Sequence, residues 1–177
     1  ISPEGDFVTL IEEIANIKGV KRIRYTSPHP KDISEDLIKT MVKYSNICNY
    51  VHLPLQAGSN RVLKLMNRNY TKEEFLDLVD LIRTYMPDCS ISTDIIVGFP
   101  GETDGEFRET LDVVDKARFD FAYMFKYSPR PGTKAAEYTN QIDEKIKQNR
   151  LAELIEIQNS IRLEVNKQRI GSVQKVL

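Results

Sequence analysis

Cysteine is scarce in this chain: only Cys48 and Cys89 occur among its 177 residues. They lie far apart, and neither belongs to a spacing that binds zinc or an iron–sulfur cluster. Two isolated cysteines without secretory features do not indicate a disulfide framework. We therefore expect both to be small buried hydrophobic residues, and we expect no metal site built from this chain alone.

Long hydrophobic runs and a dominant charge are also missing. No apolar stretch reaches the length that spans a bilayer, and no signal peptide is recognisable. The formal net charge is −1, so no overall field draws the chain to nucleic acid or to an anionic membrane. We expect a cytoplasmic protein with no membrane partner.

The chain has the size and composition of one globular domain with a substantial core. Hydrophobic residues make up 41% and charged residues 29%, both ordinary values. The chain starts with Ile1 rather than methionine, and its last five residues read as the start of a strand. We expect it to be a piece of a longer protein.

Strand and helix patterns alternate along the chain. Apolar segments predict strands at residues 22–25, 50–53, 90–97 and 119–127. Amphipathic segments predict helices between and around them, with capping boxes at Thr71 to Glu74 and Thr103 to Glu106. Without hairpin signals, this order predicts right-handed βαβ units and an α/β fold with a parallel sheet. Half of an eight-stranded barrel and a four-stranded open sheet fit equally well.

Polar residues follow every predicted strand. In chain order, the four loops supply Thr26, Ser27 and His29, then His52, Gln56 and Ser59, then Asp94 and Glu102, then Ser128 and Arg130. Because the carboxyl ends of parallel strands meet at one edge, we expect these side chains to converge. That convergence predicts an enzyme core.

Most of these residues also have a structural interpretation. His29 can stand exposed in a rigid turn between two prolines, and His52 can be a hydrogen-bonded core histidine. Gln56 and Ser59 can cap the next helix, and Glu102 can be a charge in a first helical turn.

The turn at residues 98–101 and the carboxylate of Asp94 need separate interpretations. The turn offers backbone N–H groups near a helix start, a weak anion-binding signal, or is only a tight βα turn. It lacks the glycine spacing of a dinucleotide loop and the lysine of a P-loop. Asp94 lies in a buried strand, where a carboxylate needs a partner or a function, and we favour a function.

Four segments together resemble a known family. Residues 24–30, 52–59, 92–103 and 128–133 are similar, in order and spacing, to consecutive motifs of the radical SAM methylthiotransferases. The loop Thr26-Ser27-Pro28-His29-Pro30 resembles most the branch of tRNA-2-methylthio-N6-dimethylallyladenosine synthases. The branch that modifies a ribosomal protein usually differs in this loop and around His52.

The resemblance implies a three-part protein. An N-terminal domain holds one 4Fe-4S cluster, a radical SAM core holds a second that binds S-adenosylmethionine, and an RNA-binding TRAM domain follows. The core is a partial (β/α) TIM-like barrel, of which residues 1–170 would hold strands three to six, and residues 171–177 would begin the TRAM domain. The family's cluster cysteines lie upstream and are absent here, so we expect this fragment alone to bind no cofactor or metal and to be inactive.

The resemblance also implies an activity, partners and site roles. The parent protein would transfer a methylthio group to a tRNA adenosine near the anticodon, with tRNA, an external electron donor and a sulfur source as partners. The residues implied to bind the cofactor are Gln56, Ser59, Asp94, Gly98, Glu102 and Arg130. Those implied to face the substrate are Thr26, Ser27, His29, His52 and Ser128.

Other functions remain open at this point. The parent protein can act on a ribosomal protein or on another tRNA base. A barrel enzyme without iron–sulfur chemistry would use Asp94 and Glu102 as an acid/base pair. A non-catalytic RNA-binding scaffold is disfavoured by the near-neutral charge and by the lack of basic residues clustered with aromatic ones.

Overall fold

The computed structural model describes residues 6–26 and 29–173, and within them three parallel strands form one sheet. The strands are β1 (Tyr50–His52), β2 (Ser90–Val97) and β3 (Phe121–Lys126), in the order β1-β2-β3. A further parallel bridge joins Gln56 to Ile95, which carries the pairing of β1 and β2 into the loop. The predicted α/β fold with a parallel sheet is confirmed.

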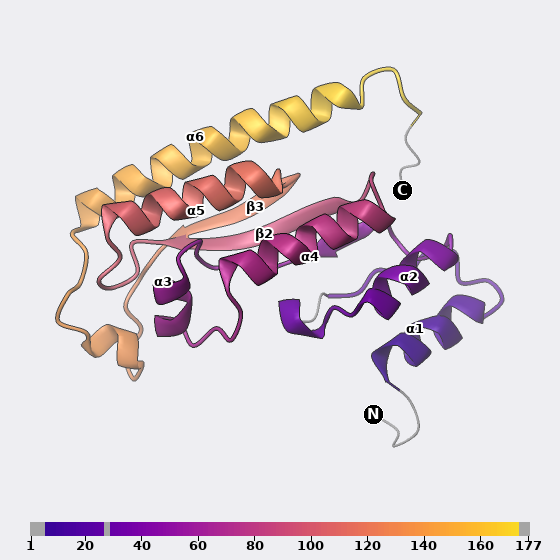
Figure 1. Cartoon of the computed structure of the whole chain (residues 1–177), viewed down its shortest axis with the longest axis horizontal. Helices are drawn as coiled ribbons and strands as arrows, with labels where there is room; N and C mark the ends of the chain where they lie inside the picture. The colour runs from indigo at the N-terminus through magenta and orange to yellow at the C-terminus, as the bar shows by residue number, and fades with distance from the viewer. Residues whose placement is uncertain (1–5, 27–28, 174–177) are drawn as a thin grey trace.

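Six α-helices and two short 3-10 turns accompany the sheet in the described residues (Figure 1). The helices are α1 (Phe7–Asn16), α2 (Glu35–Lys43), α3 (Asn60–Leu65), α4 (Lys72–Tyr85), α5 (Asp104–Ala117) and α6 (Glu144–Gln168), and the turns are η1 (Pro30–Asp32) and η2 (Lys134–Glu137). Both predicted capping boxes are present, at the starts of α4 and α5. Each satisfies backbone N–H groups that a helix start leaves unpaired.

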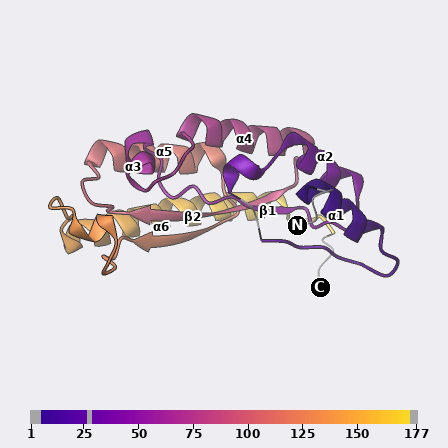
Figure 2. The same ribbon diagram turned by 90° about the horizontal axis from the view of Figure 1, so that it is seen from below.

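The two faces of the sheet have different surroundings. Helices α3, α4 and α5 lie together on one side (Figure 2), and α6 packs against α5 and β3. On the helix-covered face, Ile91, Ile95 and Val97 of β2 are fully buried. Among the described residues no helix covers the other face, where three aromatic side chains of β3 are exposed: Phe121, Tyr123 and Phe125.

The predicted strand at residues 22–25 is not a strand. Ile23 makes a single parallel bridge to Ile47: its N–H donates to the Asn46 carbonyl at 2.7 Å, and its carbonyl accepts from Cys48 N at 2.9 Å. The segment runs past the turn before β1 instead of alongside β1, so the ladder stops after one pair. Arg24 then packs over the ring of Tyr50, with 4.2 Å from guanidinium carbon to ring centroid. The expectation of four strands was therefore wrong for the described residues.

The two cysteines differ in burial. Cys89 is 1% exposed, and burial raises the pKa of its thiol to about 12, so it behaves as the expected hydrophobic residue. Cys48 is half-buried, so the prediction of burial is confirmed only for Cys89. Across the described ranges, no helix is long and apolar enough to cross a membrane.

One glycine lets the loop after β1 touch α5. The N–H of Gly58 donates to the hydroxyl of Thr110 at 2.9 Å. A Cβ at this position would lie 2.4 Å from the Cα of Thr110 and 2.8 Å from the carbonyl oxygen of Glu109. Because both neighbours are backbone atoms of a helix, a side chain cannot be accommodated by a rotamer change.

We expect Gly58→Ala to lower the free energy of unfolding by about 1–3 kcal/mol, because the loop must move away from α5. Chemical denaturation measures the change. Gly105→Ala is the matched control, since its nearest neighbour would be the Thr103 hydroxyl at 3.9 Å, and it should be neutral or slightly stabilising. Equal stability of the two variants would show that the close approach does not constrain the fold.

Candidate active site

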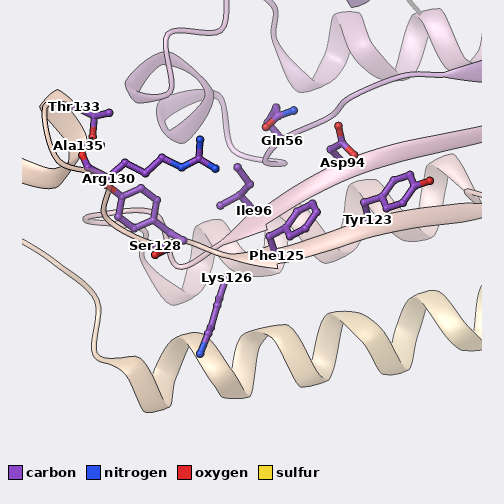
Figure 3. Close-up of a pocket in the computed structure, with 11 residues that line it drawn as sticks. Gln56, Asp94, Ile96, Tyr123, Phe125, Lys126, Ser128, Arg130, Thr133 and Ala135 are labelled. Carbon is purple, nitrogen blue, oxygen red and sulfur yellow. Dashed lines mark hydrogen bonds between the residues drawn. The ribbon is translucent and has the colours of Figure 1, made fainter. Parts of the chain in front are cut away.

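A cavity of about 770 Å³ opens at the carboxyl ends of β2 and β3 (Figure 3). It is lined by residues from the loop after β1, from β2 and β3, and from the loop after β3: Gln56, Asp94, Ile96, Tyr123, Phe125, Lys126, Tyr127, Ser128, Arg130, Thr133 and Ala135. Four predicted residues from three separate segments thus meet here, namely Gln56, Asp94, Ser128 and Arg130. This is the edge at which parallel α/β proteins place their sites.

The alternation of strand side chains decides which residues reach this cavity. In the register of β2 and β3, Asp94 lies beside Tyr123 and Ile96 beside Phe125, so all four share one face. Figure 3 shows them around the cavity, while Lys126 points away toward α6. There its ammonium group pairs with Glu144.

A row of hydrogen bonds crosses the open face from β1 to Asp94. The hydroxyl groups of Tyr50 and Ser92 lie 2.7 Å apart, and Ser92 Oγ lies 2.8 Å from His52 Nδ1. His52 Nε2 then lies 3.2 Å from Asp94 Oδ2. His52 is therefore a hydrogen-bonded histidine, which agrees with its structural interpretation from the sequence. It also fixes the carboxylate of Asp94, which lines the cavity.

Gln56 adopts an unusual backbone conformation. Its φ is +69°, which is unfavourable for a residue with a side chain, and such strain costs on the order of 1–3 kcal/mol. Two backbone hydrogen bonds to β2 hold it: its N–H donates to the Asp94 carbonyl at 2.8 Å, and its carbonyl accepts from Ile96 N at 2.9 Å. The side chain lines the cavity and does not cap α3. Retained strain at a cavity indicates a functional position.

Glu102 lies inside the protein and not at the cavity. Its side chain is 1% exposed, and Oε2 accepts hydrogen bonds from Gly98 N at 2.7 Å and Arg150 Nη1 at 2.8 Å. Burial raises the pKa of this carboxyl group. The N–H of Gly101 donates to the Asn140 carbonyl. The backbone N–H groups of Gly98 and Gly101 therefore already have acceptors within the protein. That favours the tight βα turn over an anion site, and the roles of Gly98 and Glu102 toward a cofactor remain predictions.

The other predicted residues lie away from the cavity lining. Ser59 is the N-cap of α3, and its hydroxyl donates to Glu106 Oε1 at 3.1 Å. His29 caps η1 through its side chain. Thr26 is exposed, and Ser27 lies outside the described residues. Their contacts with cofactor or substrate also remain predictions.

Sequence reasoning missed the aromatic residues of the site. Tyr123 and Phe125 line the cavity with exposed fractions of 50% and 53%, and Phe121 precedes them on the same face. The signal was present, because three aromatic residues alternate along one predicted strand. Alternation in a half-buried strand normally marks the core face, but here it marks the open one.

The residues described here do not fit an iron–sulfur cluster. Such clusters are held by several cysteine thiolates, whereas the thiol of Cys89 is buried with a raised pKa and Cys48 stands apart from it. Within residues 6–26 and 29–173, no three His, Cys, Asp or Glu side chains are grouped as metal ligands. Ligands for such a cluster would have to come from outside these ranges.

Glu102→Gln should destabilise the protein by about 3–5 kcal/mol, because it removes the charge that compensates the buried guanidinium of Arg150. Asp104→Asn is the control, since Asp104 pairs with the same arginine at 2.5 Å but its side chain is 91% exposed. We expect that variant to lose less than about 1 kcal/mol. Similar losses in denaturant titrations would contradict the assignment of Glu102 as the essential partner.

The acid stability of the protein should depend on Glu106. A hydrogen bond from Arg61 holds the pKa of this carboxyl group at about 2, below its ordinary value of 4.5. The unfolded state therefore binds more protons between pH 4.5 and 2, and the stabilisation is lost as the pH falls through that window. Glu106→Gln should show a shallower loss of stability over this range.

Curated relatives match almost the whole chain. Proteins named tRNA-2-methylthio-N(6)-dimethylallyladenosine synthase from Pelotomaculum thermopropionicum, Acetivibrio thermocellus and Aquifex aeolicus are 49%, 51% and 48% identical over 97% of this chain. The chain spans only 38%, 36% and 39% of their respective lengths.

A solved structure and a family model identify the fold. Coproporphyrinogen III oxidase (HemN) from Escherichia coli, described as a radical SAM enzyme, aligns with a TM-score of 0.63 and 23% identity. The alignment covers 75% of this chain and 31% of that one, and it shows a shared fold, in agreement with the predicted partial barrel. The model of the Radical SAM superfamily matches residues 2–114. Since that match covers more than half of this chain, the chain belongs to the radical SAM superfamily.

Proposed function

We propose that the protein to which this chain belongs attaches a methylthio group to a tRNA adenosine, with S-adenosylmethionine and two 4Fe-4S clusters as cofactors. The observation that carries the proposal is the identity of about 50% over 97% of the chain to synthases named for this product. The cluster ligands, an electron donor and a sulfur source would be supplied by other parts of the protein or by partners.

The cavity residues fit the polar groups of S-adenosylmethionine. The guanidinium of Arg130 suits the carboxylate of the methionine part, since arginine binds carboxylates through paired hydrogen bonds. Figure 3 shows Arg130 reaching over the cavity toward Gln56 and Ile96. Asp94 and Gln56 offer oxygens to the ammonium group or the ribose hydroxyls. Bound in a radical SAM enzyme, this cofactor supplies a carbon radical that removes hydrogen from unactivated C–H bonds.

The hydrogen-bonded row from Tyr50 to Asp94 sets the direction of the carboxylate. Oδ2 of Asp94 is taken by His52, and its Oδ1 has no hydrogen bond partner in the described part of the chain. Its side chain is 31% exposed, so Oδ1 is free to accept a hydrogen bond from a ligand. His52 thus acts by positioning Asp94, and the precise orientation of both is maintained by Ser92.

The exposed aromatic residues of β3 suit a nucleobase. Tyr123 and Phe125 stand beside Asp94 and Ile96 in the sheet register. Proteins bind unpaired RNA bases by stacking them on aromatic rings. The relatives' product carries a dimethylallyl group, which favours an apolar surface over water. We therefore place the target adenine against these two rings, next to the cofactor.

The acid/base alternative receives no support from the geometry. It requires Asp94 and Glu102 to face one substrate, but Glu102 lies inside the protein against Arg150, while Asp94 lines the cavity. A ribosomal protein as substrate is disfavoured by the names of the relatives compared above.

The test uses the full-length natural protein, purified without oxygen. We expect bound iron and sulfide, cleavage of S-adenosylmethionine, and methylthiolated adenosine in tRNA detected by mass spectrometry. Asp94→Asn should lower the cleavage rate at least about tenfold, because it removes a charged hydrogen bond acceptor. Arg162→Gln, at an exposed position on α6 that does not line the cavity, should leave the rate unchanged. An iron-free protein that leaves tRNA unmodified would refute the proposal.

A further inference from the structure

Two buried cations near the start of α6 contact the turn that follows β2. Arg150 pairs with Glu102 inside the protein, as described above. One helical turn earlier, the side chain of Lys147 lies against Gly98. Residues that are distant along the chain therefore hold both ends of the turn at residues 98–102.

The hydrocarbon stem of Lys147 occupies the space beside Gly98. A Cβ at Gly98 would lie 2.5 Å from Cγ of Lys147 and 3.3 Å from its Cβ and Cδ. The φ of Gly98 is +72°, a conformation that glycine adopts without steric cost. The turn thus lacks a side chain at this position, and the lysine stem packs there instead.

The ammonium group at the end of this stem is only partly compensated. Lys147 is 4% exposed, although lysine is almost never fully buried unless it is paired. Its ionic partner among the described residues is Glu144, at 3.7 Å, which is longer than a hydrogen bond. Glu144 is itself exposed and also pairs with Lys126. The carboxylate therefore offsets only part of the cost of burying this charge.

The other neighbour of the ammonium group is the ring of Tyr127. Nζ of Lys147 lies 5.6 Å from the ring centroid, within the range of a cation–π interaction. Tyr127 directly follows β3, and its ring lines the cavity of the candidate active site. Lys147 does not line that cavity, so it contacts the cavity wall without touching a ligand bound there.

We propose that Lys147 is a positioning residue for the cofactor. Its stem supports the turn at Gly98, and its ammonium group fixes the ring of Tyr127 in the cavity wall. The inference rests on the proposed function, which places S-adenosylmethionine in this cavity. An apolar side chain of similar length would fill the same space without the cost of a buried charge. The lysine therefore indicates that the charge itself acts, and the ring is the group it faces.

The test separates the charge of Lys147 from its stem. The full-length natural protein, purified without oxygen, is titrated with S-adenosylmethionine in the absence of reductant, so that binding is measured without turnover. Lys147→Met keeps most of the stem and removes the ammonium group, and it should raise the Kd about fivefold. The cleavage rate at saturation should change less than about twofold, because the residue does not touch the reacting atoms.

The stability of the same variant distinguishes positioning from a merely structural role. Lys147→Met removes a poorly compensated buried charge, so its free energy of unfolding should be equal to that of wild type or higher. Weaker binding in a protein of undiminished stability cannot result from general damage to the fold. Lys145→Met is the matched control, since Lys145 is an exposed lysine in the first turn of α6, and its Kd should equal that of wild type.

A double-mutant cycle with Tyr127 tests whether the ring transmits the effect. Lys147→Met should not raise the Kd further once Tyr127→Leu has removed the ring. Its effect should persist beside Tyr127→Phe, which keeps the ring and loses only the hydroxyl. This second pair keeps the test valid if Tyr127→Leu does not fold.

Three results would overturn the inference. An unchanged Kd in Lys147→Met would show that the charge does not influence the cofactor. A raised Kd that persists in full beside Tyr127→Leu would show that another residue transmits the effect. A raised Kd accompanied by lower stability would assign Lys147 a structural role only.

Failure of the proposed function gives a different result. In that case the wild-type protein itself would neither bind S-adenosylmethionine nor modify tRNA, and both proposals would fall. Wild-type protein that does both, together with an unchanged Kd in Lys147→Met, would reject only the positioning role.

Discussion

The alternation of side chains along β2 is the constraint on which the rest of the site depends. β2 pairs on both sides, with β1 and β3, so its register is fixed twice. Ile95 and Val97 are thereby directed under the helices, and Asp94 and Ile96 toward the cavity. A shift of one residue would exchange these sets, placing a carboxylate in the core and aliphatic residues at the site. Core packing and site geometry are thus selected by the same backbone hydrogen bonds.

A buried ion pair fixes the turn at the carboxyl end of β2. Glu102 connects the turn after β2 to Arg150 of α6, and α6 in turn packs against β3. Burial disfavours the charged carboxylate and raises its pKa, and the guanidinium offsets part of that cost. Glu102, which one alternative interpretation of the sequence made half of an acid/base pair, therefore fixes the loop geometry. Removing one partner of such a pair is strongly destabilising, because the other charge then stays buried and uncompensated. We therefore expect the pair to favour this loop conformation over others.

Local signals predicted most of the fold, whereas the directions of side chains depended on tertiary context. The alternation of elements and the capping boxes at Thr71 and Thr103 are local patterns, and both were predicted. Residues 22–25 have strand-like side chains, but a strand needs a neighbour along its length, and Ile23 has one for a single pair. Asp94 could be assigned to the cavity because strand alternation is regular. The place of Glu102 could not be predicted, because the path of its turn decides where its side chain points.

On β3, the residues that shape the cavity are different from the residues that pack in the core. Tyr123 and Phe125 contribute to the cavity, but their rings are half exposed and the core lies on the opposite side of the strand. Exchanging them for other side chains changes the shape of the cavity wall while the buried contacts of Ala122 and its neighbours persist. Substitutions can therefore change this wall of the cavity with little penalty in folding. A scaffold built in this way is suited to a superfamily whose members share a fold and act on unrelated molecules.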